Sequence, residues 1–446
     1  MTNKPVASPP SNTSEVGYRW FVLVMLTLVY TFNFIDRQIL VILQEPIKAE
    51  LDLSDAQLGL LTGFSFAVVY VCAGIPIAYL ADRSNRRNIV AVSLAVWSSM
   101  TALSGMVSSY SQLVLARLGV GIGEAGGSPP AHSMLCDYFP PEQRGMALSF
   151  YSTGIYIGIL LGFAGGGWVA ESLGWRQAFF VIGIPGVIFA VFLAALVREP
   201  RRGRWEGGVI APKATFSDTF SLLKGRPAFW WIAFGCAFKS FVSYGNGNFF
   251  PSFLIRNHGM TIGDVGLYLG LISGLAGALG TFLGGFLGDR LGIHDKRWYV
   301  WVPLWGTLIA LPPYAYILLG DDVDVILMIL IPTTILNTLY LGPSIAMCQS
   351  IVAPSMRAVA SAVMFFILNM VGLGLGPLMV GVLSDLYVPI FGDDHLRYAM
   401  FTALAFGLFG VFCFWRGSRR LLDDISAQAR DSVAQSAAQS AARSVV

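Results

Sequence analysis

The chain has 446 residues, of which 55% are hydrophobic and 12% are charged, and its formal net charge is +3. A soluble domain of this length cannot bury so much apolar surface, so we expect an all-α integral membrane protein. The small, scattered charge argues against a nucleic-acid-binding protein, and no nucleotide-binding motif occurs. Five cysteines, an odd number, suggest neither a disulfide framework nor a metal site.

Apolar windows of about 20 residues, the length needed to cross a bilayer as helix, recur along nearly the whole chain. Twelve of them are predicted as transmembrane helices. Their expected ranges are 18–43, 55–81, 88–107, 110–136, 144–170, 176–197, 228–255, 263–288, 297–319, 324–349, 357–385 and 396–417.

A short motif occurs twice, at residues 80–87 and 287–292, and its aspartates, Asp82 and Asp289, are 207 residues apart. The same offset relates Gly59 to Gly266. Repeated motifs at one offset indicate a duplicated membrane protein. We therefore predict two pseudo-symmetric six-helix bundles.

Basic residues concentrate in the loop after the second span and in the central linker, whereas the opposite loops are acidic or neutral. The positive-inside rule then places both termini in the cytoplasm. The protein is expected in the inner membrane if it is bacterial. The predicted organisation is a tail at 1–17, a bundle at 18–197, a linker at 198–227, a bundle at 228–417 and a tail at 418–446.

The repeated loops end one helix with an acid and open the next with arginine. Such charge pairs near helix ends can hold two helices together and release them when a bundle moves. They are interpreted as a cytoplasmic gate. The alternative, strongest for Arg86 alone, is that these cations only set topology. The predicted gate residues are Asp82, Arg83, Arg86, Arg87, Asp289 and Arg290.

The motif at 80–87 resembles the loop signature of the major facilitator superfamily, and the resemblance extends through both halves. Residues 117–124 in the fourth span match a second family motif. Glycines 154, 158, 162 and 166 form a stripe in the fifth span that permits close helix packing. The resemblance implies a transporter built from two six-helix bundles.

Within that superfamily, residues 33–37, 82–86, 121–125 and 198–201 resemble the spinster-like transporters. The anion:cation symporter branch also carries an Asp-Arg pair in its first span and an acid in its fourth. Resemblance to spinster implies an amphiphilic substrate, such as a lysophospholipid or a sphingoid lipid.

Five charged residues fall inside hydrocarbon-length spans, where an isolated charge costs at least about 2.5 to 3.5 kcal/mol. They are Asp36, Arg37, Arg117, Glu124 and Lys239. Water access and pairing change the proton affinity of a buried carboxyl. We therefore predict Asp36 and Glu124 as proton carriers, with Arg37 and Arg117 as exchangeable counter-ions or substrate contacts. The alternative is a buried ion network that only fixes helix packing.

Lys239 lies about eleven residues into the seventh span and is predicted to contact substrate, although it could instead snorkel to the membrane edge. Other polar side chains within spans are candidates for a cavity wall. Each could equally make a helix-to-helix hydrogen bond. These candidates are Asn33, His132, Tyr244, Asn246, Asn337, Tyr340 and Asn369.

The sequence thus predicts a proton-coupled secondary transporter that works by alternating access around a central cavity and functions as a monomer. Its expected partners are protons, membrane lipid and a small amphiphilic or anionic substrate. A proton-coupled symporter of small organic anions is the first alternative, and a non-transporting membrane receptor is the second. No nucleophile-base pair, metal cluster or phosphate loop is visible, so neither an enzyme nor a cofactor or metal is expected.

Overall fold

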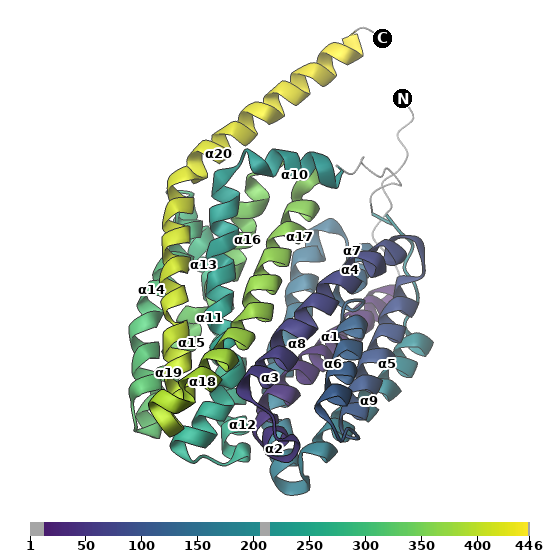
Figure 1. Ribbon diagram of the computed structural model, residues 1–446. Coiled ribbons are helices and arrows are strands. Elements are labelled where there is room, and N and C mark those ends of the chain that lie inside the picture. The colour runs from purple at the N-terminus through teal and green to yellow at the C-terminus, as the bar shows by residue number, and fades with distance from the viewer. Residues whose placement is uncertain (1–12, 206–214, 445–446) are drawn as a thin grey trace. The chain divides into compact units, whose positions relative to one another are not determined.

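The computed structural model of the chain describes residues 13–205 and 215–444, and these residues form helices without a strand (Figure 1). The predicted all-α class is confirmed. The described residues divide into two compact units. The first holds residues 13–205 and 248–275, and the second holds residues 215–247 and 276–444.

Most helices belong wholly to one unit. Those of the first unit are α1 (Thr13–Ile42), α2 (Gln44–Leu51), α3 (Asp55–Gly59), η1 (Leu60–Phe64), α4 (Ser65–Arg83), α5 (Arg86–Ser104), α6 (Tyr110–Glu124), α7 (Ser128–Tyr138), α8 (Pro141–Leu173), α9 (Trp175–Leu196) and α12 (Ile262–Leu271). Those of the second are α10 (Phe216–Lys224), α13 (Gly277–Gly292), α14 (Trp298–Leu319), α15 (Val323–Thr338), α16 (Leu341–Ser350), η3 (Pro354–Met356), α17 (Arg357–Ile367), η4 (Leu368–Leu375), α18 (Gly376–Phe391), η5 (Gly392–Asp394), α19 (His395–Ala403) and α20 (Ala405–Ser444). Helices α11 (Pro227–His258) and η2 (Ile272–Ala276) have residues in both.

Eight helical segments in the described part of the chain are long and apolar enough to cross a membrane. The last, Arg357–Asp431, contains two of the predicted spans, so the eight segments account for nine of the twelve. The remaining three predicted spans coincide with α5, with α6 and α7, and with α11. These helices carry buried polar or charged side chains such as Arg86, Arg117 and Lys239, which lower their hydropathy. Polar side chains of this kind face the interior of a helix bundle.

The glycine stripe of α8 packs directly against α1. A Cβ atom added at Gly158 would lie 2.6 Å from the backbone oxygen of Thr31, and one added at Gly154 would lie 2.8 Å from that of Thr27. Neither position has room for a side chain. The close helix contact that the stripe predicts is therefore present in the first unit.

A second face of α8 packs against α12. A Cβ atom at Gly266 would lie 2.4 Å from the backbone oxygen of Phe163, and one at Gly167 would lie 2.7 Å from that of Ile262. Glycine on both helices thus lets the two backbones meet. This contact helps to explain why residues 248–275 group with the first unit, although the repeat assigns them to the second half. The predicted division into two bundles stays a prediction.

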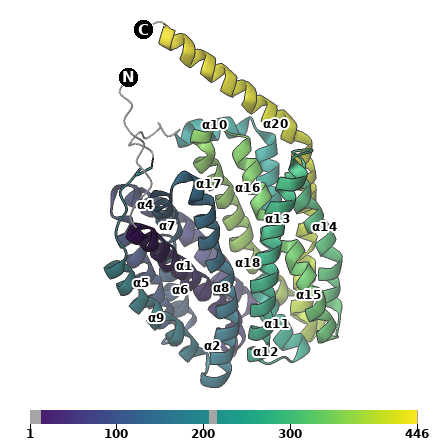
Figure 2. The same cartoon turned by 180° about the vertical axis from the view of Figure 1, so that it is seen from behind.

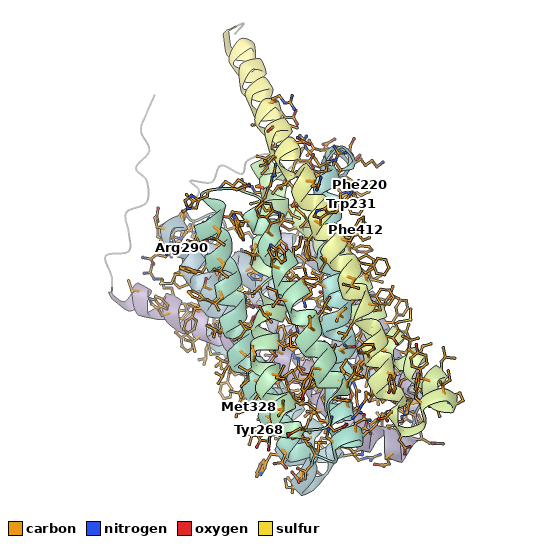
Figure 3. All side chains as sticks on the ribbon, turned by 90° about the vertical axis from the view of Figure 1, so that its left-hand side faces the viewer. Phe220, Trp231, Tyr268, Arg290, Met328 and Phe412 are labelled. Carbon is orange, nitrogen blue, oxygen red and sulfur yellow. The ribbon has the colours of Figure 1, made fainter. Side chains whose placement is uncertain are left out.

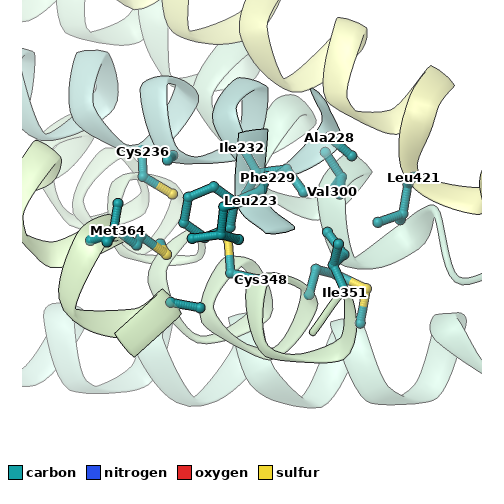
Figure 4. Packing of buried hydrophobic residues seen from close by; sticks show 14 of the residues in the cluster. Leu223, Ala228, Phe229, Ile232, Cys236, Val300, Cys348, Ile351, Met364 and Leu421 are labelled. Atoms are coloured by element: carbon teal, nitrogen blue, oxygen red, sulfur yellow. The ribbon is translucent and has the colours of Figure 1, made fainter. Parts of the chain in front are cut away.

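The second unit has an apolar core at the end from which α20 continues (Figure 4). Leu223 of α10, Phe229 at the start of α11 and Cys348 of α16 are fully buried there. Helix α20 runs on to Ser444, past the predicted end of the twelfth span (Figures 1 and 2). Its extension is tied to the start of α11 because the Ala228 backbone N–H donates to the Asp424 Oδ2 at 2.8 Å.

Candidate functional site

Two helix positions bring the charges of the first unit together. Asp36 and Arg37 lie in the interior of α1, and Glu124 is the last residue of α6. The sequence predicts one continuous helix at 110–136, but the structure breaks it at residues 125–127. Pro129 and Pro130 lack the N–H groups that would continue the helical hydrogen bonds. The break leaves Glu124 at a helix end inside the membrane-spanning region.

Glu124 pairs with Arg37 rather than with the arginine of its own helix. The Arg37 Nε donates to the Glu124 Oε2 at 2.7 Å, and the Glu124 side chain has no exposed surface. Arg117, also buried, is oriented toward α1, where its Nη1 lies 3.5 Å from the backbone oxygen of Asp36. The four charged residues predicted for this unit therefore form one buried cluster, which we call the acid-arginine cluster.

Several buried polar atoms of the acid-arginine cluster lack a hydrogen-bond partner among the described residues. Asp36 is 1% exposed, and neither of its carboxylate oxygens forms an ion pair or a hydrogen bond of normal geometry among the described residues, although the side chains of Thr101 and Trp97 lie close enough to donate weakly. The Glu124 Oε1 and the Arg117 Nε are also buried without a partner there. Leaving a buried polar group unpaired costs about 1 to 3 kcal/mol, and more for a charged group. An arrangement of this kind favours a proton on a carboxyl group or a bound polar ligand.

The aromatic ring of Phe66, in α4, lies against the guanidinium groups of both arginines. The guanidinium carbons of Arg37 and Arg117 lie 4.9 and 5.0 Å from the centre of its ring. Arg37 is also 5.2 Å from the ring centre of Tyr70, one turn further along α4. Contacts between cations and aromatic rings are worth about 2 kcal/mol or more when desolvated. The rings thus stabilise two cations that have few acidic partners.

The second unit contains two neighbouring side-chain hydrogen bonds between predicted site residues and their partners. Lys239, in the middle of α11, is 3% exposed and donates a short hydrogen bond to the Asn337 Oδ1. The next residue, Ser240, lies with its Oγ 2.9 Å from the Tyr340 hydroxyl oxygen. Asn337 and Tyr340 flank the turn between α15 and α16, where the tenth predicted span breaks. The structure therefore brings three predicted site residues together and adds Ser240 to them.

The other predicted wall residues differ in exposure. His132, in α7, is exposed and its ring centre lies 5.0 Å from that of Tyr151. Asn33 is 5% exposed. Asn246 is fully buried and donates to the backbone oxygen of Met400 at 3.1 Å, which is a helix-to-helix bond. Tyr244 and Asn369 are partly exposed.

Arg86 is a structural junction within the first unit. It is 3% exposed, and its guanidinium bonds the Asp137 carboxylate at 2.6 Å and the Glu199 carboxylate at 2.7 Å. The Arg87 backbone N–H donates to the other oxygen of Glu199 at 2.9 Å. These bonds tie α5 to α7 and to the chain after α9. Arg86 and Arg87 thus connect elements within the first unit, and their predicted role in a gate stays a prediction.

The remaining predicted gate residues lie at the surface of their units. Arg83 and Arg290 are exposed, and the Arg83 guanidinium carbon lies 4.0 Å from the ring centre of Tyr79. Asp289 is exposed and accepts a hydrogen bond from the Tyr299 hydroxyl at 2.8 Å. The side chain of Asp82 lies outside the described part. The gate stays a prediction.

Sequence reasoning missed a second charge cluster in the first unit, which we call the Arg256 cluster. Arg256 donates to the Glu45 carboxylate at 2.8 and 3.0 Å and to both oxygens of Asp55 at 2.8 Å. Lys48 bonds the Asp55 Oδ1 at 2.6 Å. Burial alone lowers the pKa of Arg256, but its bonds to Asp55 and Glu45 outweigh burial and raise that pKa above its usual value. One signal in the sequence could have indicated this cluster. Lys48 and Arg256 are basic residues on the side of the membrane where the positive-inside rule predicts acidic or neutral loops.

In the described part of the chain, no group of three or more His, Cys, Asp and Glu side chains is placed to hold a metal ion. The polar groups of both sites are instead single cations, carboxyls, amides and hydroxyls. Such groups can bind and release protons and orient a polar head group.

Comparison with known proteins identifies the fold. The family model of the Major Facilitator Superfamily matches residues 26–377. The chain belongs to the major facilitator superfamily. It is 38% identical over 412 residues to an MFS-type efflux pump of Mycolicibacterium smegmatis, covering 92% of this chain and 95% of that protein. It is 31% identical over 205 residues to a probable galactarate/D-glucarate transporter of Bacillus subtilis, covering 45% of each.

A solved structure matches almost the whole of this superfamily member. It is the crystal structure of a bacterial homolog to the human lysosomal transporter Spinster, in an inward-facing and unoccupied conformation. The TM-score is 0.83 at 32% identity, and the match covers 94% of this chain and 99% of that one. The predicted resemblance to spinster-like transporters is confirmed. These relatives are transporters, and the chain is a multi-pass membrane transporter, not an enzyme.

Proposed function

We propose that this transporter couples the movement of an amphiphilic, anionic-headed substrate to protons, with Asp36 and Glu124 as the proton carriers. The observation that carries the proposal is the buried carboxyl of Asp36, which forms no ion pair among the described residues, beside the Arg37–Glu124 pair. A buried carboxylate without an ion pair is strongly disfavoured, whereas the neutral acid is tolerated. Asp36 is therefore suited to hold a proton in one state and to lose it when water or a cation reaches it.

The Arg37–Glu124 pair supplies the coupling step. Protonation of Glu124 removes its negative charge and frees Arg37 to bind an anionic head group. Conversely, loss of that proton restores the pair and displaces the anion from Arg37. Proton and substrate are then bound together and released together, which is the coupling of a symporter. One proton crossing 100 mV supplies about 2.3 kcal/mol, enough to sustain a gradient of roughly fifty-fold.

Lys239 is the proposed head-group contact of the second half. It has no carboxylate partner among the described residues, and Asn337 supplies only an amide oxygen. An anionic substrate would provide the missing charge.

A second candidate function is proton-coupled symport of small organic anions. The buried cations suit a carboxylate as well as a lipid phosphate, and the Bacillus subtilis relative is described as a probable sugar-diacid transporter. A carboxylate substrate would need Arg37, Arg117 or Lys239 but no apolar tail site.

The cellular setting is part of the proposal. The basic loops support cytoplasmic termini and, in a bacterium, insertion in the inner membrane. The protein is proposed to function as a monomer.

Proton flux in liposomes tests the proposed function. Purified protein is reconstituted and challenged with lysolipids and, separately, with sugar diacids, while a pH-sensitive dye reports proton movement. We expect flux with lysolipids in the native protein and its loss in the Asp36→Asn and Glu124→Gln variants. The matched control is Asp393→Asn, which removes an exposed acid. Substrate movement without proton movement would sink the assignment of the carriers, and flux with diacids alone would select the second candidate.

A further inference from the structure

An aromatic groove lies on the second unit between α14 and α20. It has a volume of about 580 Å³ and is lined by nine side chains, of which four are tryptophans: Trp298, Trp301, Trp305 and Trp415. Figure 3 shows Phe412, which also lines the groove, next to Trp231 of α11, and the two ring centres are 5.9 Å apart. A volume of this size accommodates a ligand of ordinary organic size.

The groove opens on an apolar outer surface rather than into the core. Trp305 is 49% exposed and Phe412 is 47% exposed, and Ile309 beside them is 53% exposed. Helix α14 lies at the edge of the second unit in both ribbon views (Figures 1 and 2). Apolar surface of this extent on a membrane-spanning helix is covered by lipid chains. A lipid is therefore the expected occupant of the groove.

The two helices run antiparallel, which places their basic ends together. Asp321, just after α14, pairs at 3.3 Å with Arg397 of α19, the helix that precedes α20. The end of α14 thus lies near the start of α20, and the start of α14 lies beside the later turns of α20. Arg297 precedes Trp301 by one helical turn, and Arg419 follows Trp415 by one turn. Both arginines therefore lie at the same end of the groove.

Two arginines of α20, Arg416 and Arg419, lie over aromatic rings. The Arg419 guanidinium carbon lies 4.5 Å from the ring centre of Trp415, and that of Arg416 lies 5.6 Å from the ring centre of Trp231. The Arg297 Nε is buried without a hydrogen-bond partner among the described residues.

Three nearby acids have other partners, and Asp423, one turn after Arg419, is exposed. Asp295 accepts from the Arg297 backbone N–H at 2.8 Å, and Asp424 accepts from the Ala228 N–H. Asp431 is bonded by Arg226. Three guanidinium groups at one end of an apolar groove thus lack a carboxylate partner in the described structure, and they provide the charge that attracts an anion.

We propose that this groove is a binding site for an anionic phospholipid. An acyl chain lies against the tryptophan rings, and the phosphate is bound at the basic end by Arg297, Arg416 and Arg419. Guanidinium groups bind phosphate through paired, charge-assisted hydrogen bonds, and a ring beneath the guanidinium limits its motion before binding. Basic pockets between membrane helices on the cytoplasmic side bind anionic head groups for the same reason. The site is separate from the proposed transport residues and does not depend on their role.

Quenching of tryptophan fluorescence by brominated lipid chains tests the site directly. The full chain is reconstituted in phosphatidylcholine, and phosphatidylglycerol or further phosphatidylcholine with brominated chains is titrated in. We expect the native protein to be quenched by the anionic lipid at a concentration roughly tenfold or more below that needed for the neutral lipid, since each basic residue near a membrane surface contributes about fivefold. Equal quenching by the two lipids would mean an ordinary aromatic belt and would overturn the proposal.

Two matched comparisons assign the effect to the groove. The double variant Arg416→Gln with Arg419→Gln should lose most of the preference, whereas Arg201→Gln with Arg430→Gln, which removes two exposed cations elsewhere, should keep it. Equal loss in both would indicate a general surface-charge effect and contradict the site. Replacing the four groove tryptophans by phenylalanine should remove the lipid-selective quenching. Trp168→Phe, which removes a 67% exposed ring on α8, should leave it unchanged.

Discussion

The two halves of the chain use the same structural device with different chemistry. In the first unit, Arg37 of α1 meets Glu124, where the fourth predicted span breaks. In the second unit, Lys239 of α11 meets Asn337, beside the break in the tenth predicted span. One half therefore pairs its cation with an acid, and the other pairs it with a neutral amide. The comparison teaches that both halves place a cation beside the break in a predicted span, and the partner of that cation distinguishes them: a titratable acid in the first half and an uncharged amide in the second.

The largest expected effect comes from Glu124→Gln, which makes the first half resemble the second. The variant keeps a hydrogen-bond acceptor for Arg37 but removes the charge, so proton binding can no longer release the arginine. The coupling step is then lost, so substrate-driven proton flux should fall to the background level of protein-free liposomes. Initial rates of substrate-driven proton flux in liposomes measure it.

The control for Glu124→Gln lies in the second half. Asn337→Ala removes the amide next to Lys239, and this substitution should leave the proton response qualitatively intact. If Glu124→Gln retained coupled flux while Asn337→Ala abolished it, the roles assigned to the two halves would be reversed.

The Arg256 cluster differs from the acid-arginine cluster in its hydrogen bonding. The carboxylates of the Arg256 cluster are bonded by Arg256 and Lys48, whereas buried atoms of the acid-arginine cluster lack a partner among the described residues. A stability measurement can therefore compare the two clusters. Asp55 has no exposed side-chain surface and is bonded by both Arg256 and Lys48. Asp55→Asn should therefore lower stability by about 3 to 5 kcal/mol, because two cations lose their shared partner. Thermal unfolding in detergent, followed by the midpoint temperature, reports the loss.

Asp36→Asn is the matched control for that measurement. The Asp36 oxygens form no ion pair and no hydrogen bond of normal geometry among the described residues, so the neutral isostere loses little and should unfold within about 1 kcal/mol of the native protein. Equal destabilisation by the two substitutions would show that Asp36 also serves packing, as the buried-network alternative holds.

The sequence is sufficient to predict the fold class and the charged residues of the site, but not which side chains form pairs. Charges in apolar windows and a repeated loop motif were sufficient to predict the fold class and to select Asp36, Arg37, Arg117 and Glu124. The similar depths of Asp36 in the first span and Arg117 in the fourth indicate that these two side chains can meet across the bundle, but the ion pair in the structure joins Arg37 to Glu124. Side-chain partners across helices depend on rotation about each helix axis, which helix length and hydropathy do not determine. The Arg256 cluster was missed because its members come from segments about 200 residues apart.

Residues of one sequence motif also differ in how deeply their side chains are buried. Arg83, Arg86 and Arg87 belong to one loop motif, yet Arg86 is enclosed by Asp137 and Glu199 whereas Arg83 is exposed. Acids just after the fourth span and after the sixth provide the partners. The motif predicts a basic loop, and only tertiary packing determines which arginine stabilises the fold.

The smallest expected effect comes from Asn337→Asp, which makes the second half resemble the first. The new carboxylate lies within hydrogen-bond reach of Lys239 and supplies the negative charge that we assign to the substrate. Affinity for an anionic-headed substrate should then fall about tenfold, or about 1.4 kcal/mol, because the head group must displace an internal partner. Binding titrations with a lysophosphatidic acid and with a lysolipid that carries a cationic head measure the difference. Asn337→Gln preserves the amide and should leave both affinities near their native values. Weaker binding of the cationic lipid by the aspartate variant, to the same extent as the anionic one, would mean that Asn337 shapes the cavity and does not set the charge preference of the second half.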